Sequence, residues 1–327
     1  MSQDPVARVG TTLGPWTVDE MLGEGSVAAV YSAHDDAGNR VALKVLHPHT
    51  ARSDDVCRRF LREARVANSI PHSGVVRVLE GGLTDDDCPY LAIELLDGET
   101  VEARWERKGN RLPVAEVMWI ADQLLDILAT AHKKGVVHRD VKPDNLFFTT
   151  DRRLKLLDFG IARLSEATSG PGGNVVGTMV GSVLGTPAFM PPEQARGDNT
   201  DVGIESDLWA VGATMYTLLS GRLVHEEEDI GSQLHAIASR AAPSLGVVAP
   251  EVPDSVVGLV DHALAFDRTK RWPRARAMQN ALRLAYREMA PDAGHGPIPL
   301  EGESSEPVLR LLRPEAPPMS LRRPPQG

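Results

Sequence analysis

One short segment of the chain combines side chains that could catalyse transfer of a group to an alcohol. The segment HRDVKPDN, residues 138–145, holds a carboxylate base, two cations and a carboxamide within eight residues. Asp140 could accept a proton, Lys142 could neutralise negative charge, and Asn145 could bind a metal ion through its amide oxygen. A loop that only connects two elements rarely concentrates such groups. This segment is therefore the first candidate for a catalytic site.

Asp158 is the second candidate for chemistry. It follows the apolar residues Leu156 and Leu157, precedes Phe-Gly, and lies 13 residues after Asn145. A carboxylate that emerges from an apolar strand is well suited to hold a divalent cation by its oxygens. Asn145 and Asp158 are therefore predicted to be metal ligands.

Two further segments, both in the amino-terminal part of the chain, suggest contacts with phosphate groups. In GEGSVAAV, residues 23–30, glycines would let the backbone approach phosphate oxygens and present amide donors, although a plain hairpin turn could have this composition. In VALK, residues 41–44, a lysine ends an apolar strand. Burying a lysine is costly unless its charge is paired, so an interior Lys44 predicts a carboxylate or phosphate partner. A strand-end lysine that reaches solvent is the alternative.

These segments must be positioned by strands in the first part of the chain and by helices in the rest. Short apolar stretches separated by turn sequences predict an antiparallel meander over residues 17–45. The clearest helix is 114–134, whose apolar residues recur at helical spacing and should pack into a core. Further strands are expected at 75–79 and 90–95, and further helices at 53–69, 206–219 and 255–265.

The order of these motifs resembles that of the eukaryotic-like, Hanks-type serine/threonine protein kinases found in bacteria. The glycine segment, the VALK lysine, the HRD segment, Asp-Phe-Gly and a Pro-Glu motif follow one another over residues 23–193, and similar features continue to Arg271. The probability that so many motifs occur in the correct order by chance is negligible. The resemblance implies an α+β, bilobal protein-kinase-like fold, with a small antiparallel-sheet lobe that carries one helix and a larger, mainly helical lobe.

The resemblance and the change from strands to helices near Asp97-Gly98 divide the chain into four parts. Nine of the 24 prolines lie after Ala290, which is typical of an extended tail. The expected parts are a flexible amino terminus (1–13), a small ATP-binding lobe (14–97), a large lobe with the catalytic and activation loops (98–289) and a proline-rich disordered tail (290–327).

The resemblance also implies a role for each catalytic residue. Asp140 would accept the proton of the substrate hydroxyl, and Lys142 would stabilise the transferred phosphoryl group. Lys44 would contact the α- and β-phosphates of ATP. Glu63, in the helix expected at 53–69, would pair with Lys44.

A nucleotide site and a metal site are implied in the same way. Gly23 and Gly25 would cover the phosphates of ATP. The remaining residues expected around the nucleotide are Val30, Ala42, Ile93, Glu94, Leu96 and Phe147. Asn145 and Asp158 would hold Mg²⁺, with Mn²⁺ as the alternative ion. ATP and a divalent cation are thus the expected cofactors.

The implied activity is transfer of the γ-phosphate of ATP to serine or threonine hydroxyls of protein substrates in bacterial signalling. Lys142 within HRDVKPDN is typical of the serine/threonine branch of the family. A stretch rich in glycine and hydroxyl residues follows Asp-Phe-Gly and predicts autophosphorylation, first at Thr178 and second at Ser182. Arg139 could receive such a phosphate. A second copy of the chain, in a transient dimer, is therefore an expected partner.

Some residues have expected structural roles, and others depart from the family pattern. Glu193 would pair with Arg271, and Asp207 would brace the catalytic loop. Ala28 stands where the family has its third loop glycine, which predicts weaker nucleotide affinity. Pro191 replaces the usual alanine, which removes an amide donor and predicts altered peptide selection.

These departures support an alternative function, a nucleotide-binding scaffold with low turnover. Phosphorylation of a small molecule is disfavoured because such enzymes typically lack a segment like residues 185–193. The residues His47 and His49 could suggest a metal site, but two histidines in one loop are more often solvated, and we expect that here.

Composition bounds the remaining possibilities. The chain has 327 residues, and its 45 acidic and 35 basic residues give a net charge of −10, which disfavours nucleic acid as a partner. The two cysteines have no CxxC spacing, which excludes a disulfide framework or a zinc ribbon. The least polar stretch, 208–219, has 12 residues, whereas a membrane span needs about 20. We therefore expect a cytoplasmic protein with no membrane span.

Overall fold

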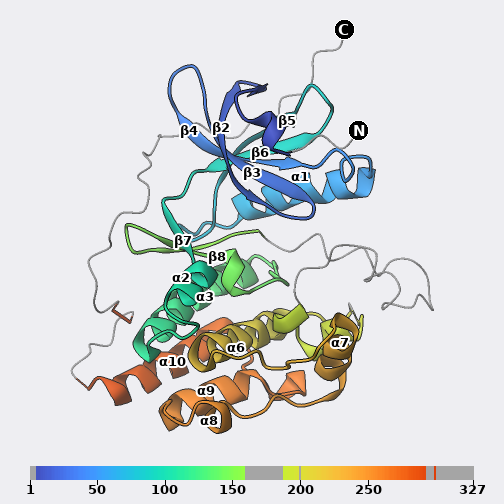
Figure 1. The fold of residues 1–327 in the computed structure, drawn as a ribbon. Coiled ribbons are helices and arrows are strands. Elements are labelled where there is room, and N and C mark those ends of the chain that lie inside the picture. Colours follow the sequence, from blue (N-terminus) through green and yellow to red (C-terminus); the bar gives the residue numbers. More distant parts are fainter. Residues whose placement is uncertain (1–4, 159–186, 199, 292–297, 300–327) are drawn as a thin grey trace. The chain divides into compact units, whose positions relative to one another are not determined.

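The computed structural model describes residues 5–158, 187–198, 200–291 and 298–299, which form two compact units (Figure 1). The first unit contains the described residues up to 71 and residues 75–98, and the second contains residues 72–74 and the described residues from 99 onward. An antiparallel sheet and one α-helix make up most of the first unit, whereas the second unit is mainly helical. The predicted α+β class is confirmed.

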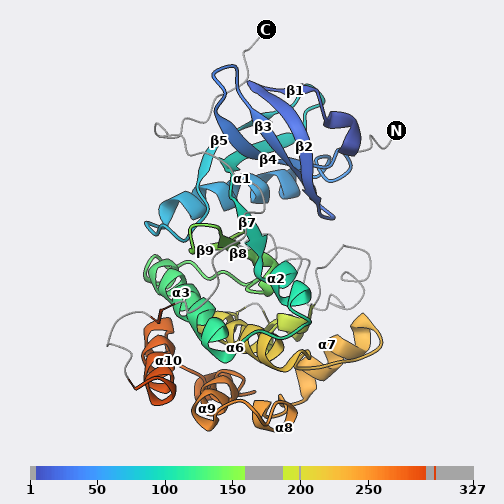
Figure 2. The ribbon, with the colours of Figure 1, turned by 60° about the vertical axis from the view of Figure 1, so that its left-hand side comes forward.

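Six antiparallel strands form the sheet of the first unit (Figure 2). They are β1 (Thr12–Leu13), β2 (Trp16–Glu24), β3 (Ala28–His34), β4 (Arg40–Leu46), β5 (Val78–Leu83) and β6 (Pro89–Glu94), in the order β1-β2-β3-β4-β6-β5. The turn between β3 and β4 is closed by Asp35, whose carboxylate accepts the amides of Ala37 and Asn39 at 3.0 and 2.8 Å. The predicted meander is therefore present.

Each face of this sheet contributes to its own hydrophobic cluster. Successive side chains of a strand point to opposite faces, so Ala29 and Leu43 belong to one cluster and Ala28 to the other. The helix α1 (Asp54–Ser69) covers the second face and buries Phe60 and Ala64 there. The helix predicted at 53–69 is thus confirmed, and its apolar spacing explains which side faces the sheet.

Strand β5 differs from the strand predicted at 75–79. It runs from Val78 to Leu83 through Gly81 and Gly82, although glycine usually weakens a strand. A Cβ added to Gly82 would lie 2.6 Å from the hydroxyl oxygen of Tyr90 on the paired strand β6, so this glycine makes room for the tyrosine. The strand continues because of a contact that no local pattern reveals.

The amino-terminal segment also differs from the prediction of a flexible region over residues 1–13. A 3₁₀ turn η1 (Pro5–Arg8) and strand β1 occupy most of its described part. The Arg8 guanidinium donates to both carboxylate oxygens of Asp86, at 3.2 and 2.7 Å, and Arg8 is only 8% exposed. Because the two residues are 78 positions apart, a reading of the local sequence could not foresee this anchor.

Helices form most of the second unit. They are α2 (Val101–Arg107), α3 (Val114–Lys133), α5 (Pro192–Ala195), α6 (Ile204–Ser220), α7 (Ile230–Ser239), α8 (Leu245–Val248), α9 (Asp254–Ala263) and α10 (Ala275–Met289). A small sheet is formed by β7 (Gly98–Thr100), β8 (Leu146–Thr149) and β9 (Leu154–Leu156), and the 3₁₀ turns are η2 (Pro143–Asn145), η4 (Pro187–Phe189) and η5 (Arg268–Lys270). The helices α1, α3, α6 and α9 lie close to their predicted bounds.

Helix α6 is the central element of the second unit. Every residue from 206 to 220 is buried, and the helix contacts α3, α9 and α10. Among its buried polar side chains, Ser206, Asp207 and Ser220 are hydrogen-bonded to groups on other segments or within the helix. Within the described part of the chain, no helix combines the length and the apolar character that crossing a bilayer requires.

A buried ion pair ties α5 to the segment after α9. The Arg271 guanidinium donates to both carboxylate oxygens of Glu193 at 2.8 Å, and Ser206 Oγ donates to the same carboxylate at 2.7 Å. Burial opposes ionisation of Glu193, but the bonds and charge of Arg271 outweigh it and lower the pKa of Glu193. Arg271 also lies over the ring of Trp209 at 4.8 Å. The predicted pairing of Glu193 with Arg271 is confirmed.

We expect Arg271→Ala to lower the free energy of unfolding by about 3–5 kcal/mol, because it leaves the Glu193 carboxylate buried without its cation. Urea denaturation followed by circular dichroism measures this loss. The control is Arg222→Ala, which breaks an exposed pair with Glu226 and should change stability little. Equal losses in the two variants would contradict the assignment of Arg271 as a buried structural partner.

Candidate active site

The loop that carries Asp140 is fixed by a carboxylate of the central helix. The backbone amides of His138 and Arg139 each donate to Asp207 at 2.8 Å, and His132 Nε2 lies 2.8 Å from the same carboxylate. Asp207 is in the first turn of α6 and only 1% exposed. The predicted bracing role of Asp207 is confirmed.

Arg139 holds a backbone conformation that this network must maintain. Its φ of +69° lies in the left-handed region, which few residues other than glycine adopt. The Arg139 amide is bound by Asp207, and its carbonyl accepts Gln194 Nε2 at 3.3 Å. Such strain persists only where surrounding contacts impose it, and it turns the chain sharply just before Asp140.

His138 links this loop to the segment that precedes Asp158. The His138 ring is fully buried, and burial lowers its pKa, so the ring is neutral. Its Nδ1 accepts the amide of Asp140 at 3.3 Å, which leaves Nε2 to carry the hydrogen and donate to the carbonyl of Leu157 at 3.1 Å. One neutral ring therefore orients both segments that hold candidate site residues.

Three of the predicted site residues meet at the Asp140 carboxylate. Asn145 Nδ2 donates to Asp140 Oδ2 at 3.1 Å and to the Asp140 carbonyl at 2.7 Å, and Lys142 Nζ lies 3.7 Å from Oδ2. The side chains of Asp140 and Lys142 are 20% and 15% exposed, so both are shielded yet reachable. A carboxylate oriented in this way, with a cation beside it, can accept a proton from an alcohol.

Asn145 and Asp158 lie at the same end of the β8–β9 hairpin. Leu146 pairs with Leu156, and the Leu157 amide donates to the Asn145 carbonyl at 2.8 Å. Asn145 directly precedes the hairpin and Asp158 closely follows it. An amide oxygen and a carboxylate are donors that suit Mg²⁺, which commonly uses one or two protein ligands together with substrate phosphates. The donor set thus fits the predicted metal.

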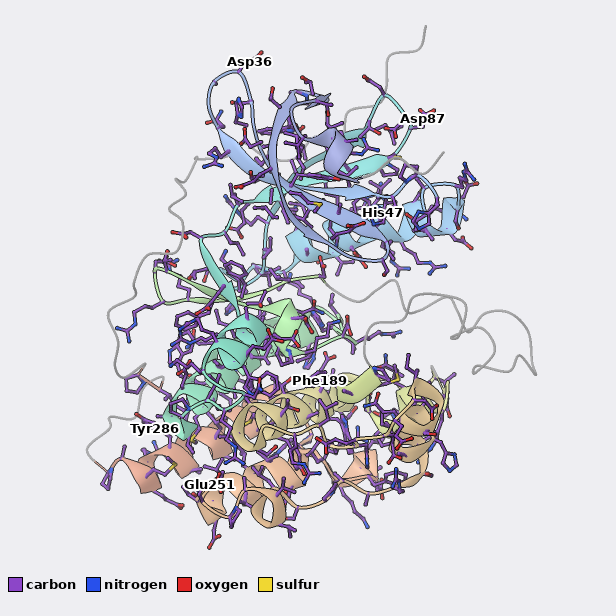
Figure 3. All side chains as sticks on the ribbon, viewed as in Figure 1. Asp36, His47, Asp87, Phe189, Glu251 and Tyr286 are labelled. Carbon is purple, nitrogen blue, oxygen red and sulfur yellow. The ribbon has the colours of Figure 1, made fainter. Side chains whose placement is uncertain are left out.

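A small hollow adjoins Asp140 on the second unit. Residues 139–141 line it together with residues 189–191 and the side chains of Gln194, Ser206 and Ala210. Phe189, labelled in Figure 3, is the first residue of the second lining segment. The segment before Glu193 therefore lies beside the candidate catalytic carboxylate, where it could contact an incoming chain.

Four of the predicted nucleotide residues of the first unit share one face of its sheet. Val30 pairs with Lys44, and Ala42 pairs with Ile93, so these side chains project to the same face. The α1 cluster, which includes Ala28 and Leu46, occupies that face, and Glu63 lies on α1. Glu94 ends β6 and Leu96 follows it, whereas Phe147 is on β8 of the second unit.

Local packing does not require the two glycines Gly23, near the end of β2, and Gly25, in the loop before β3. Neither Gly23 nor Gly25 has a positive φ. A Cβ on Gly23 would meet no atom within 4 Å, and a Cβ on Gly25 would meet only the Ala28 carbonyl oxygen at 3.4 Å. The fold around both positions would therefore accommodate a side chain.

One pair of acidic residues escaped the sequence analysis. The hydrogen bond between Glu102 on α2 and Asp144, together with burial, raises the pKa of Glu102 to about 8, while Lys142 opposes the shift. Glu102 therefore keeps its proton near neutral pH and shares it with Asp144. The residues are far apart in sequence, and no motif connects them, so only the packing of α2 against η2 could reveal this pair.

We expect Glu102→Gln to become more stable relative to the wild type as the pH rises. Between the ordinary pKa of 4.5 and about 8, the folded protein binds a proton that the unfolded chain does not. This contribution is complete below the lower value and is lost as the pH rises through the higher one. The amide of the variant stays neutral, so its melting temperature minus that of the wild type should increase with pH.

The control is Glu228→Gln, which removes an exposed carboxylate that is not among the groups acting on Glu102. Its difference from the wild type should stay constant over the same pH range. A constant difference for Glu102→Gln would show that Glu102 is ionised throughout and would contradict the shared proton.

Comparison with known proteins identifies a family whose members this chain resembles. The protein kinase domain family matches residues 16–283. The serine/threonine-protein kinase Pkn1 of Myxococcus xanthus is 37% identical over 88% of this chain and 40% of its own length. The serine/threonine-protein kinase PrkC of Bacillus subtilis is 32% identical over 84% of this chain and 41% of its own length.

A solved structure extends the likeness to the fold. The PknI kinase domain of Mycobacterium tuberculosis aligns with a TM-score of 0.65 and 28% identity, over 85% of this chain and 98% of that domain. The chain spans about two fifths of the length of the curated relatives named above. The predicted kinase-like fold and the predicted resemblance are both confirmed. The chain belongs to the protein kinase family, in its bacterial, Hanks-type serine/threonine branch.

Proposed function

We propose that the chain transfers the γ-phosphate of ATP to serine or threonine hydroxyls of protein substrates. The observation that carries this proposal is the Asp140 carboxylate, which is hydrogen-bonded by Asn145 and lies 3.7 Å from Lys142. Phosphoryl transfer mainly requires alignment of the reacting groups and neutralisation of phosphate charge. A braced carboxylate beside a cation supplies both at the acceptor hydroxyl.

In this proposal Asp140 accepts the proton of the substrate hydroxyl. The hydroxyl oxygen of the substrate forms a bond to the γ-phosphorus while the bond between that phosphorus and ADP breaks. Lys142 neutralises charge on the transferred phosphoryl group. Asn145 and Asp158 would hold Mg²⁺, or Mn²⁺ as the alternative, which would supply positive charge beside the phosphates. The fixed positions of Asn145 and the Leu157 backbone support this assignment because they preset the spacing of the two ligands.

The first unit supplies the nucleotide contacts of the proposal. Lys44 contacts the α- and β-phosphates and pairs with Glu63, and Gly23 and Gly25 cover the phosphates. The residues assigned to the rest of the nucleotide are Val30, Ala42, Ile93, Glu94, Leu96 and Phe147. Two observations support this assignment. Val30 and Lys44 project to the same face of the sheet, and local packing does not require a glycine at position 23 or 25.

The proposal also covers regulation by autophosphorylation and the location of the protein in the cell. Autophosphorylation is expected at Thr178 or Ser182, both outside the described residues, within a transient dimer of two copies. We further propose intracellular bacterial signalling in the cytoplasm, without nucleic acid as a partner. The proposed lobes are residues 14–97 and 98–289, and the expected tail lies almost entirely outside the described residues.

The alternative of a low-turnover nucleotide-binding scaffold loses one of its two arguments. Ala28 is 6% exposed and belongs to the cluster of Leu46 and Phe60, so its methyl group has a role in packing. This departure from the family pattern thus has an explanation other than lost catalysis. Pro191 remains as the one departure that still supports the scaffold.

We expect Asp140→Asn to lower the rate of phosphate transfer by about 10²- to 10⁴-fold, because an amide cannot accept the hydroxyl proton. Transfer of radiolabel from Mg-ATP to a generic basic protein substrate measures the rate. Asp151→Asn, which removes an exposed carboxylate from the β8–β9 turn, serves as the control and should keep the wild-type rate. Equal labelling by Asp140→Asn and wild type would refute the proposed catalytic role.

Incubation with Mg-ATP should place phosphate on Thr178 first and Ser182 second. Phosphopeptide mapping by mass spectrometry identifies the sites, and the double variant Thr178→Ala/Ser182→Ala should lose most of the label. The sample of Asp140→Asn is the control for contaminating kinases. Labelling confined to other residues would contradict the proposed sites while leaving the transfer activity intact.

A further inference from the structure

The loop between β2 and β3, which contains Gly25, is tied to the connection between β4 and α1. His47 Nε2 lies 2.7 Å from the Gly25 carbonyl oxygen, and the His47 amide donates to the Val27 carbonyl at 3.0 Å. Thr50 Oγ1 lies 2.9 Å from the same Val27 oxygen. His47, labelled in Figure 3, is only 8% exposed. The expectation that this histidine is solvated is therefore wrong.

The bond to Gly25 fixes the state of the His47 ring. A carbonyl oxygen can only accept, so Nε2 must carry a hydrogen and donate it. The ring of the exposed residue His49 stacks on that of His47 at a centroid distance of 5.4 Å. The nearest carboxylate oxygen recorded, Glu24 Oε1, is 4.0 Å from Nε2 and competes little with the carbonyl at 2.7 Å.

Holding the Gly25 carbonyl also orients the next amide. In a planar trans peptide, the carbonyl and the following N–H point in opposite directions. With the Gly25 oxygen turned toward His47, the Ser26 amide hydrogen points away from it. The preceding peptide is held separately, because the Gly25 amide donates to the Ala28 carbonyl at 2.9 Å.

We propose that His47 is a positioning residue for nucleotide binding: its Nε2–H holds the Gly25 carbonyl and thereby presents the Ser26 amide to a phosphate oxygen. This inference rests on the proposed function, because it assigns ATP to the loop. Amide groups fixed in advance bind phosphate better than mobile ones, since binding then costs less ordering.

His47 matters more for this orientation than its neighbour Thr50. The single hydroxyl hydrogen of Thr50 is shared between the carbonyls of Val27 and His47, at 2.9 and 2.8 Å. The Val27 carbonyl also keeps the backbone bond from His47 if that hydroxyl is removed. The imidazole, in contrast, is the only side chain recorded as a donor to the Gly25 carbonyl among the described residues.

The test compares three single-residue variants of the full chain with the wild type. His47→Leu keeps much of the side-chain volume and removes the donor, His47→Gln restores an N–H at a similar reach, and His49→Leu removes the stacking partner. Hydrogen exchange of the loop peptide is measured without nucleotide, and the Kd for ADP with Mg²⁺ is measured by calorimetry. Circular dichroism and thermal unfolding establish that each variant is folded.

We expect His47→Leu to speed exchange of the loop amides and to weaken ADP binding about 2- to 10-fold, the range typical of one hydrogen bond. His47→Gln should return both quantities most of the way to wild type, and His49→Leu should leave both near wild type. In kinetics, the KM for ATP should rise in His47→Leu with little change in kcat.

The inference is overturned if His47→Leu exchanges and binds like the wild type, or if His49→Leu has the same effect as His47→Leu. Loss of the proposed function gives a different result. If the wild type transfers no phosphate, the proposed activity fails, yet faster loop exchange and weaker ADP binding in His47→Leu would still support the positioning role.

Discussion

A single buried carboxylate, that of Asp207, determines the geometry on which the candidate active site depends. It receives the amides of His138 and Arg139 and faces His132, all at 2.8 Å. A buried charge is costly unless donors satisfy it, so the loop cannot leave this carboxylate without exposing an unpaired charge to the interior of the unit. The rigid helix α6 thereby transmits its position to the loop that carries Asp140.

The same constraint extends to the candidate metal ligands. His138 reaches from the loop to the Leu157 carbonyl, and the Leu157 amide returns to the Asn145 carbonyl. Asp158, which follows Leu157, has a φ of +39° and is thus, like Arg139, a residue in the left-handed region. Two strained residues within one hydrogen-bonded circuit indicate that the fold spends stability to aim particular side chains.

The sequence predicted those parts of the molecule that depend on local patterns and contiguous motifs. Helix α3 was foreseen because its apolar residues recur at helical spacing, and the site was foreseen because Asp140, Lys142 and Asn145 lie within one short segment. The contacts it did not reveal join residues that are distant in sequence or that carry no motif. The anchor of Arg8 on Asp86 and the proton shared by Glu102 and Asp144 belong to this group.

His47 illustrates a different limit. A histidine in a loop is usually solvated, and nothing in its neighbours indicates that the ring folds back onto the glycine segment. Strand β5 was misplaced for a related reason, because Gly82 belongs to the strand only where Tyr90 of the partner strand fills the space above it. Composition describes what a residue prefers, whereas packing decides what it contacts.

The burial of Ala28 has a consequence for engineering the glycine segment. Its methyl group is part of the cluster that joins the sheet to α1, so a mutation that restored the glycine usual in this family would remove packed volume. Such a change would also increase the conformational entropy of the unfolded chain. Glycine within a strand typically lowers stability by roughly 0.5–1 kcal/mol relative to alanine. Engineering the family's glycine into this position would therefore carry a penalty in the stability of the first unit.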